Sequence, residues 1–375
     1  MIIALSRCGW RTKILGRHRP FADLATPGRI VRAGYVTEYG PASIQVHEQS
    51  VSLPNHPPSD CIRVRVAAAS VNQLDVMMSQ GYGRSLFEAL RPQQFPFIPG
   101  LDCAGTVKEI GKSVYQFKPG DRVMGIYSPV HHGGHGTFAD LVDIPVAMAA
   151  HIPDHLSNFR ASAIPFAAMT AASAIPSAHI PRAVVLGGSG GVGLFALQIL
   201  KSRGAYVAVT CSSNNRHICL NSGADLALDY EKDDIEAQIE SESIDLVIDC
   251  SGQARDLTSS RQPLKYMRPG SAYHTLSSPF IKICDQTGNP LIGMAKAYSE
   301  LSQTKIRTWA ARRIHYNWSF FRPNPCVWQQ VITWSQDKVL RPVVSRVLPL
   351  EKLSDAFIMM ETAHLPGKIV IDMMS

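Results

Sequence analysis

The stretch VVLGGSGGVGLFA, residues 184–196, decides the fold expected for this chain. An apolar, β-branched run enters three glycines spaced GxGxxG, namely Gly188, Gly190 and Gly193, and a helical pattern follows them. In a strand–turn–helix context such glycines allow a tight turn, let the main chain approach a pyrophosphate and let the helix pack on the strand. Amides at the start of the helix then bind the phosphates, aided by the helix dipole. The stretch therefore predicts a dinucleotide site.

The residues after the next predicted strand favour NADPH over NADH. An NAD site places Asp or Glu about 20 residues further on, where its carboxylate holds the ribose 2′-hydroxyl. Here the strand at 205–210 runs into CSSNNR, and no acidic residue occurs between Gly193 and Asp225. Small hydroxyls and one cation suit a 2′-phosphate, which a carboxylate would repel. We predict phosphate contacts at Ser189, Gly190, Gly191 and Val192, and 2′-phosphate contacts at Ser212, Ser213 and Arg216, with a solvated Arg216 as the alternative.

The chain divides into a β-rich first half and an alternating second half. Short strands broken by turns, for example at 61–67, 103–107 and 122–125, indicate a barrel-like domain, and an Ala-rich helix over 161–174 bridges to the next region. From residue 182 strands near 183–187, 206–210, 225–229, 245–249 and 271–276 alternate with helices, which predicts an α/β fold with a doubly wound parallel sheet. We place the first domain at 31–175, completed by 323–375, and the dinucleotide-binding domain at 176–322.

The basic charge of the chain is concentrated at its start. The formal net charge is +7, but residues 1–30 hold six of the 37 Lys and Arg residues and one of the 30 acidic residues, so the remainder carries only +2. The charge therefore does not indicate nucleic-acid binding. A basic leader with scattered apolar residues and almost no acid is typical of a mitochondrial transit peptide, and an unstructured basic tail is the alternative.

Cysteine spacing argues against a protein held together by disulfides, and hydropathy argues against a transmembrane helix. The eight cysteines form no CxxC pair and the chain is too long to need disulfide staples, so we expect reduced, mostly buried thiols. Cys250 follows the apolar run 246–249 and is expected to pack at a strand end rather than act as a nucleophile. No apolar run reaches the length of a transmembrane helix.

Three stretches together resemble the medium-chain dehydrogenase/reductase superfamily. They are ASVNQLD at 69–75, FIPGLDCAGTV at 97–107 followed by GDRV at 120–123, and GKIV at 367–370. Within the superfamily the chain resembles the quinone oxidoreductase branch. The stretch HYNWSFF at 315–321, together with Asp229-Tyr230 and His364, is similar to the mitochondrial reticulon-interacting (Nogo-interacting) oxidoreductases.

The resemblance implies a GroES-like catalytic domain, a Rossmann domain and NADPH-dependent reduction in the mitochondrial matrix. It also implies a link to ubiquinone biosynthesis and respiratory-chain assembly. By the same likeness Tyr230 flanks the adenosine phosphate, and Leu276, Phe321, His364 and Leu365 lie by the nicotinamide. Leu276 and Phe321 as plain core residues remain the alternative.

The zinc ligands of related alcohol dehydrogenases are not evident. Asn72 stands in place of the first Cys ligand, Gly100-Leu101-Asp102 stands where Gly-His-Glu would be, and the four-cysteine lobe is missing. Zinc needs closely placed nitrogen and sulfur ligands, so we expect no metal site. The sequence HHGGH at 131–135 has no Cys or carboxylate partner at ligand spacing and is expected to be an ordinary loop.

Without a metal, hydride addition to a quinone or enone needs a polar group that stabilises the enolate. We predict that Asn72 is this group and that Tyr82 donates the proton, with a rim aromatic as the alternative for Tyr82. The Trp318, Phe320 and Phe321 cluster suits an apolar pocket for a prenylated ring.

Two other functions are left open. One is an NADPH-binding scaffold or assembly factor with weak or no catalysis, because a structural cofactor needs the same phosphate loop. The other is an enoyl-thioester reductase, for which the basic residues at 305–322 could bind a CoA-like carrier, although a solvated face or a partner contact is more common for such clusters. A homodimer and protein partners at the mitochondrial membrane are also left open.

Overall fold

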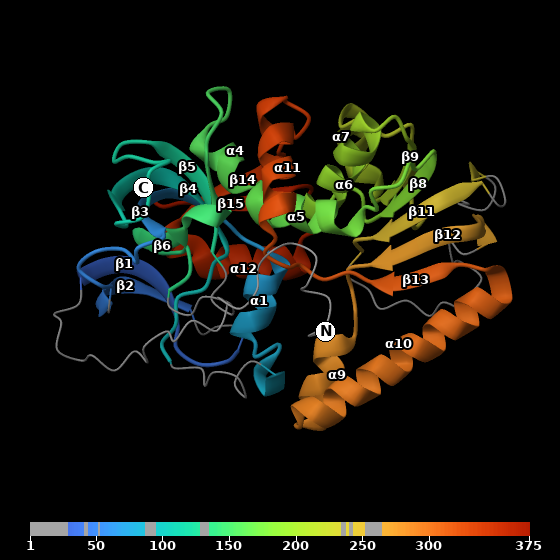
Figure 1. The fold of residues 1–375 in the computed structure, drawn as a ribbon, viewed down its shortest axis with the longest axis horizontal. Helices are drawn as coiled ribbons and strands as arrows, with labels where there is room; N and C mark the ends of the chain where they lie inside the picture. Colours follow the sequence, from blue (N-terminus) through green and yellow to red (C-terminus); the bar gives the residue numbers. More distant parts are fainter. Residues whose placement is uncertain are drawn as a thin grey trace.

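A computed structural model gives the fold shown in Figure 1. It describes residues 29–40, 44–51, 53–86, 95–127, 135–233, 238–239, 243–251 and 265–375. The predicted leader therefore lies almost entirely outside the described residues. The described chain builds two large sheets and one small antiparallel ribbon, in which β1 (Arg29–Val36) pairs with β2 (Ile44–Val51).

The second half forms the predicted parallel sheet of six strands. Its strands are β8 (Arg182–Leu186), β9 (Tyr206–Cys211), β10 (Leu226–Asp229), β11 (Ile244–Asp249), β12 (Met267–Thr275) and β13 (His315–Trp318), in the spatial order β10-β9-β8-β11-β12-β13. Every neighbouring pair is parallel. The central strands are continuous apolar runs because helices cover both faces of such a sheet. The doubly wound α/β prediction is confirmed.

The helices of this half cover the sheet and extend past its edge. They are α6 (Gly191–Ser202), η3 (Ser213–Asn215), α7 (Arg216–Asn221), α9 (Phe280–Thr287) and α10 (Pro290–Arg312). In Figure 1, α10 runs along the outer side of the edge strand β13 and marks one border of the molecule.

The first half is a seven-stranded sheet that the C-terminal residues complete. Its strands are β3 (Cys61–Ser70), β4 (Asp102–Ile110), β5 (Arg122–Ile126), β6 (Leu141–Pro145), β7 (Ala149–His151), β14 (Val344–Pro349) and β15 (Lys368–Asp372), with η2 (Val146–Met148) before β7. The strand β15 pairs antiparallel with β3, so that Val370 lies opposite Ser70. The expected return of the tail to the first sheet is thus observed, whereas the exact domain boundaries stay a prediction.

The predicted Ala-rich helix over 161–174 is wrong as a single element. The structure has two helices there, α4 (Asn158–Ser162) and α5 (Pro165–Ala174). Pro165 is the physical reason, because it has no N–H to donate to the carbonyl of Ala161 and so interrupts the helical hydrogen bonds, although Ile164 before it keeps helical dihedral angles. It is tolerated as the first residue of α5.

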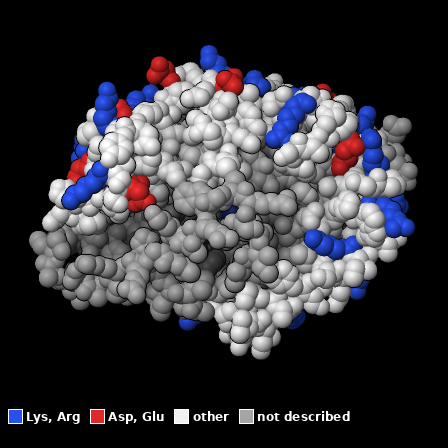
Figure 2. Space-filling view, viewed as in Figure 1, with Lys and Arg blue, Asp and Glu red and all other residues white. Residues whose placement is uncertain are grey.

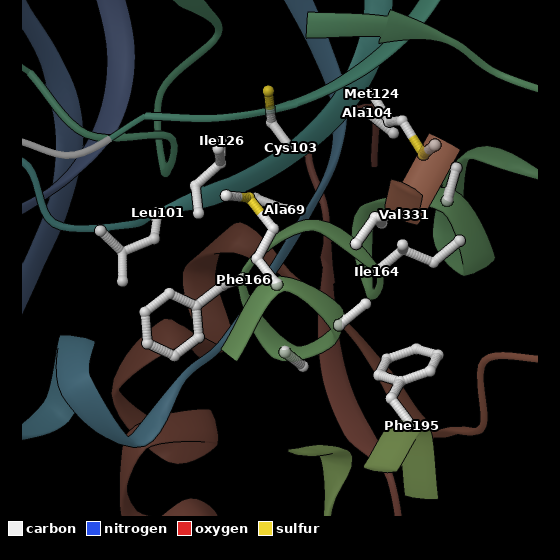
Figure 3. Packing of buried hydrophobic residues seen from close by; sticks show 14 of the residues in the cluster. Ala69, Leu101, Cys103, Ala104, Met124, Ile126, Ile164, Phe166, Phe195 and Val331 are labelled. Carbon is white, nitrogen blue, oxygen red and sulfur yellow. The ribbon is translucent and has the colours of Figure 1, made fainter. Parts of the chain in front are cut away.

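One apolar core joins the two sheets through α5. Figure 3 shows Ala69 and Cys103 of the seven-stranded sheet above Phe166 of α5, with Phe195 of α6 beyond it. The helix α5 is buried at nearly every position, because α11 (Pro325–Gln336) packs against it as well. The remaining helices are α1 (Gln73–Ser79), η5 (Leu350–Lys352) and α12 (Leu353–Thr362). This shared core fixes the phosphate loop relative to the residues of the first sheet.

Candidate cofactor and substrate site

The phosphate loop lies between β8 and α6, and two of its glycines are required by packing. A Cβ on Gly188 would lie 2.6 Å from Cβ of Val209, and a Cβ on Gly193 would lie 2.3 Å from the carbonyl oxygen of Gly187. Such contacts are impossible without a backbone shift. The amide of Gly188 also donates to the carbonyl of Thr210 at 2.8 Å. These glycines therefore hold the helix close to the sheet, as the fingerprint predicts.

The other predicted phosphate-loop residues gather at the amino end of α6. Gly190 is the N-cap and Gly191 and Val192 form the first turn, whose N–H groups have no partner within the helix. A Cβ on Gly190 would meet only the carbonyl oxygen of Gly187, at 3.5 Å, so the loop is open to an approaching group. These residues fit a pyrophosphate.

The candidate 2′-phosphate residues collect at the carboxyl ends of β9 and β10. Ser212, Ser213 and Arg216 follow β9, and the amide of Tyr230 donates to the carbonyl of Cys211 at 3.3 Å. Tyr230 is 42% exposed, which leaves its ring free to lie against a ligand. The structure therefore brings these four residues together.

Two carboxylates also lie beside these residues. The expectation that no carboxylate lies near the 2′-phosphate position is therefore wrong for the folded protein, although no acidic residue follows β9 directly in the sequence. Ser213 donates its hydroxyl to Asp229, and a guanidinium nitrogen of Arg216 lies 3.3 Å from Asp233. Lys232 donates to the Ser213 hydroxyl at 3.1 Å. Two cations and two carboxylates thus share the rim. The Ser213 hydroxyl and the amide of Glu231 hold the pKa of Asp229 below its usual range, so this carboxyl is ionised at neutral pH.

The carboxylates were missed because the sequence rule inspects only the strand after the phosphate loop. Asp229 and Asp233 follow the third strand, β10, which lies directly beside β9 in the sheet. The adjacency of β9 and β10 would have been the signal. Asp225, by contrast, accepts from the amide of Val207 and pairs with Lys201 at the opposite end of the strands.

Asn215 connects the phosphate loop to the segment before β15, a role that the sequence did not indicate. Its side-chain amide donates to the carbonyl of His364 at 3.1 Å and to the hydroxyl of Ser189 at 3.4 Å. His364 is exposed and Leu365 is partly buried against the main core. Both therefore lie near the phosphate loop.

The predicted nicotinamide residues come from three different segments. Leu276 follows β12, and its amide donates to the carbonyl of Asp249 at 3.0 Å. The ring of Phe321 lies 4.6 Å, centroid to centroid, from the ring of Phe166, whose own amide donates to Asp102 at 2.7 Å. Phe321 therefore contacts a residue, Phe166, that bonds directly to Asp102, a member of the buried polar network described next.

Asn72 belongs to a buried network with Asp102 and Lys368. Its side-chain amide donates to Asp102 at 2.9 Å and to the carbonyl of Ser70 at 3.5 Å, and its side-chain oxygen accepts from the ammonium of Lys368. The Lys368 ammonium lies 3.5 Å from the Asp102 carboxylate, which also accepts from the Ser70 hydroxyl at 2.7 Å. Asn72 is only 4% exposed. Both ends of its amide are thus engaged by protein groups.

Lys368 links this network to the phosphate loop. A Cβ on Gly191 would lie 2.6 Å from Cδ of Lys368, so the lysine stem passes directly over the first turn of α6. The preceding Gly367 has a φ of +68° and donates its amide to the carbonyl of Ser189 at 2.8 Å. In the sequence, Gly367 and Lys368 were evident only as part of the closing GKIV motif. The one available signal was the need for a counter-charge to the buried Asp102.

The network occupies the position where the family resemblance places zinc ligands. An ammonium group has no lone pair to offer a metal and itself supplies a positive charge. The described part of the chain contains no group of three His, Cys, Asp or Glu side chains able to hold a metal ion. Of the HHGGH loop, only His135 lies within the described residues; burial lowers its pKa to about 4, so its imidazole is neutral.

Tyr82 lies beyond the other end of α1 and does not join Asn72. Asn72 is the N-cap of this seven-residue helix, so roughly 10 Å of helix separates the two positions. Asp285 of α9 holds the Tyr82 loop by accepting from the amides of Gly83 and Ser85, at 2.8 and 3.0 Å. Burial, with nearby Asp285, raises the pKa of Tyr82 to about 12, so the phenol keeps its proton.

A hollow of about 410 Å³ lies beside this loop. It is lined by Gly81, Arg84, Ser85, Asp285 and Gly288. The two predicted catalytic residues therefore lie at opposite ends of α1, with Tyr82 near the hollow and Asn72 near the phosphate loop.

The cysteines of the described residues are free thiols. Cys61, Cys103, Cys211, Cys219 and Cys284 are buried, Cys250 is partly buried and Cys326 is exposed. Burial raises the pKa of Cys250 far above its usual value, which agrees with a packing role at the end of β11.

We predict that Lys368→Met lowers the free energy of unfolding by about 3–5 kcal/mol, because it leaves the buried Asp102 carboxylate without its cation. Urea unfolding followed by fluorescence measures this change. The double variant Lys368→Met/Asp102→Asn removes the orphaned charge and should recover part of the loss. Lys352→Met, at an exposed pair with Asp355, is the control and should change stability by less than about 0.5 kcal/mol. Equal losses at both lysines would contradict the assignment.

Asp75 is expected to make the stability depend on pH. Its carboxylate caps α1 by accepting from the amide of Asn72 at 2.8 Å, and burial raises its pKa from 3.8 to about 7. The folded state therefore holds a proton that the unfolded chain releases, so this contribution is present below pH 3.8 and is lost as the pH rises toward 7. Asp75→Asn should flatten this part of the pH profile of urea unfolding, whereas Asp154→Asn, at an exposed position, should leave it unchanged.

Comparison with known proteins agrees with this geometry. Residues 58–154 match the model of the alcohol dehydrogenase GroES-like domain, and residues 222–371 match that of zinc-binding dehydrogenases. The fold is similar to that of a quinone oxidoreductase from Coxiella burnetii, with a TM-score of 0.71 and 22% identity over 92% of this chain and all of the other.

Two relatives match over nearly the whole chain. The mitochondrial NAD(P)H oxidoreductase RTN4IP1 of Danio rerio is 31% identical, with 95% of each protein covered. The mitochondrial reticulon-4-interacting protein 1 of Caenorhabditis elegans is 29% identical over 92% of this chain and 96% of its own length. The chain therefore belongs to the medium-chain dehydrogenase/reductase superfamily and, within it, to the RTN4IP1 family.

Proposed function

We propose that this protein is a zinc-independent, NADPH-dependent oxidoreductase that reduces a quinone or a related enone in the mitochondrial matrix. The observation that carries the proposal is the Asn72–Asp102–Lys368 network, which joins the phosphate loop to the position of the zinc ligands in related enzymes. The names of the relatives support a mitochondrial NAD(P)H oxidoreductase. By resemblance, the reaction is linked to ubiquinone biosynthesis and respiratory-chain assembly.

The phosphate loop and its rim would hold the cofactor. Amides of Ser189 to Val192 would bind the pyrophosphate, and Ser212, Ser213, Arg216 and Tyr230 would surround the 2′-phosphate; their positions at the start of α6 and after β9 and β10 support this. The cations Arg216 and Lys232 favour the phosphate, while Asp229 opposes it. Leu276, Phe321, His364 and Leu365 would border the nicotinamide, which supplies the hydride when the cofactor is bound.

The network supplies positive charge where negative charge develops on the substrate. Hydride addition to a quinone or enone places negative charge on an oxygen, and a fixed donor or cation in a dry site stabilises it. Since both ends of the Asn72 amide are engaged, we assign Asn72 the role of holding the Lys368 ammonium in place. Tyr82, with its proton retained, then serves as the proton donor at the hollow.

The alternative functions predict different outcomes in one assay. The leader-trimmed protein is mixed anaerobically with NADPH and, separately, a short-chain ubiquinone analogue, an alkenal or an enoyl thioester, with NADH as the control. The proposal expects fastest NADPH oxidation with the quinone or the alkenal. Tight NADPH binding with no turnover would favour a scaffold, and turnover of the thioester alone would favour an enoyl-thioester reductase.

We predict that Arg216→Ala weakens NADPH binding about tenfold or more, because a charged hydrogen bond to phosphate contributes about 1.5–3 kcal/mol. NADH binding should change little, and calorimetric titration with both nucleotides measures the difference. Arg160→Ala, at an exposed arginine of α4, is the control. Asp229→Asn should strengthen NADPH binding relative to NADH. A wild-type preference for NADH would refute the cofactor assignment.

We predict that Tyr82→Phe lowers kcat with little effect on NADPH binding, because the phenol is removed while the ring and its packing stay. The loss should lie in the range of general acid catalysis, about 10²–10⁴-fold. Stopped-flow turnover and nucleotide titration measure the two quantities. An unchanged kcat would remove Tyr82 from the mechanism.

A further inference from the structure

The helix α10 presents a mostly apolar ridge to solvent, interrupted by one serine. The ridge consists of Leu291, Ala295, Tyr298, Ser302, Ile306 and Trp309, which are all exposed and recur every three or four residues along one face. The buried residues of the helix, Gly293, Ala297 and Thr308, lie on the other side. The helix therefore has two apolar faces, of which the described chain covers one.

The exposure of this ridge is large for apolar side chains. Leu291 is 73% exposed and Ile306 is 67% exposed, and Ile292, beside the ridge, is 60% exposed. Trp309 is held in place, because its ring lies 4.8 Å from the ring of His315 and 5.3 Å from the guanidinium of Arg313. Apolar patches of this extent on a folded protein mark interaction surfaces.

Two cations lie beside the ridge. Lys305 and Arg312 border it on one side, whereas Lys296 and Arg307 lie on the far face of the helix, by their positions along α10. Glu300 is the one acidic residue between 290 and 313. In Figure 2, Lys and Arg side chains lie among uncharged residues at the right edge of the molecule, where α10 ends in Figure 1.

The ridge begins next to the hollow beside Tyr82. Gly288, which lines the hollow, is followed after two residues by Leu291. The apolar cluster of Phe280 and Ile283 on α9 lies under the same end of α10, and Leu86, Trp318 and Phe320 pack against it. This cluster lies on the buried side of α10, close to the residues that line the hollow.

We propose that α10 binds in the plane of an anionic lipid membrane. A row of exposed Leu, Tyr, Ile and Trp side chains on one helix, with Lys305 and Arg312 beside it, resembles the apolar face of an interfacial membrane helix. No helix in the described ranges is long and apolar enough to cross a bilayer, so the contact is peripheral.

Membrane contact would give the proposed reaction access to a lipid-soluble substrate, and only this consequence depends on the proposed function. The hollow beside Tyr82 would then lie close to the bilayer surface. Lipid binding itself needs neither cofactor nor turnover. It can therefore be tested separately from catalysis.

The test is flotation of the leader-trimmed full-length protein with vesicles. One set contains phosphatidylcholine alone and the other contains one-third phosphatidylglycerol. The proposal expects flotation with the anionic set, weakened by high salt. Leu291→Ser/Ile306→Ser and, separately, Lys305→Glu/Arg312→Glu should each reduce the bound fraction about tenfold or more at limiting lipid.

Matched controls keep the result specific to α10. Tyr115→Ser removes a side chain that is 86% exposed on the other half of the molecule, and Lys112→Glu/Lys118→Glu reverses two exposed cations there. Both should float like the wild type. Circular dichroism and nucleotide titration establish that every variant is folded.

Three results would overturn the proposal. They are no flotation of the wild type, flotation that the α10 variants do not change, and equal losses in the control variants. A wild-type dimer that α10 substitutions convert to a monomer in sedimentation, without any flotation, would assign the ridge to a second copy instead.

Discussion

The ion pair between Lys368 and Asp102 is the interaction on which the site depends. Asp102 is fully buried and receives hydrogen bonds from Ser70, Asn72 and the amide of Phe166. A buried carboxylate is tolerated only with such donors and a counter-charge. Because the lysine reaches this carboxylate across the first turn of α6, one side chain of the seven-stranded sheet also lies against the phosphate loop of the other half.

The same arrangement places a lysine at the position where the family resemblance puts zinc ligands. Burial lowers the pKa of Lys368, while Asp102 and Asp75 oppose that change. The two carboxylates therefore offset part of the cost of burying this amine. Asn72 forms part of that support, which differs from the direct contact with substrate expected from the sequence alone.

Much of the fold could be predicted from the sequence because local patterns determine it. The glycine run at 187–193, the alternating strands and helices after residue 182 and the turns of the first half are all short-range signals, and each produced the expected element. The helix over 161–174 failed because a single proline was given too little weight against a run of alanines. The return of the tail to β3 followed from its being too short to fold alone.

The site was harder to predict because its parts meet only in three dimensions. Asp229 and Asp233 face Ser213 and Arg216 because β10 lies beside β9, and no spacing rule along the chain contains that fact. Lys368 meets Asn72 from 296 positions away. Residues of the predicted phosphate loop lie together because they are consecutive, whereas Asn72 and Tyr82 were expected in one centre and lie at opposite ends of α1.

The position of Gly367 near the end of the chain also constrains how the protein is made. The phosphate loop emerges from the ribosome long before the strand that contacts it, because Ser189 bonds to Gly367 only after almost all residues have been synthesised. Until then the buried carboxylate of Asp102 lacks its lysine. A chain that stopped before residue 368 would contain every glycine of the fingerprint and would still lack the partner of Asp102. Closure of the site therefore waits for β15, which is synthesised long after the phosphate loop.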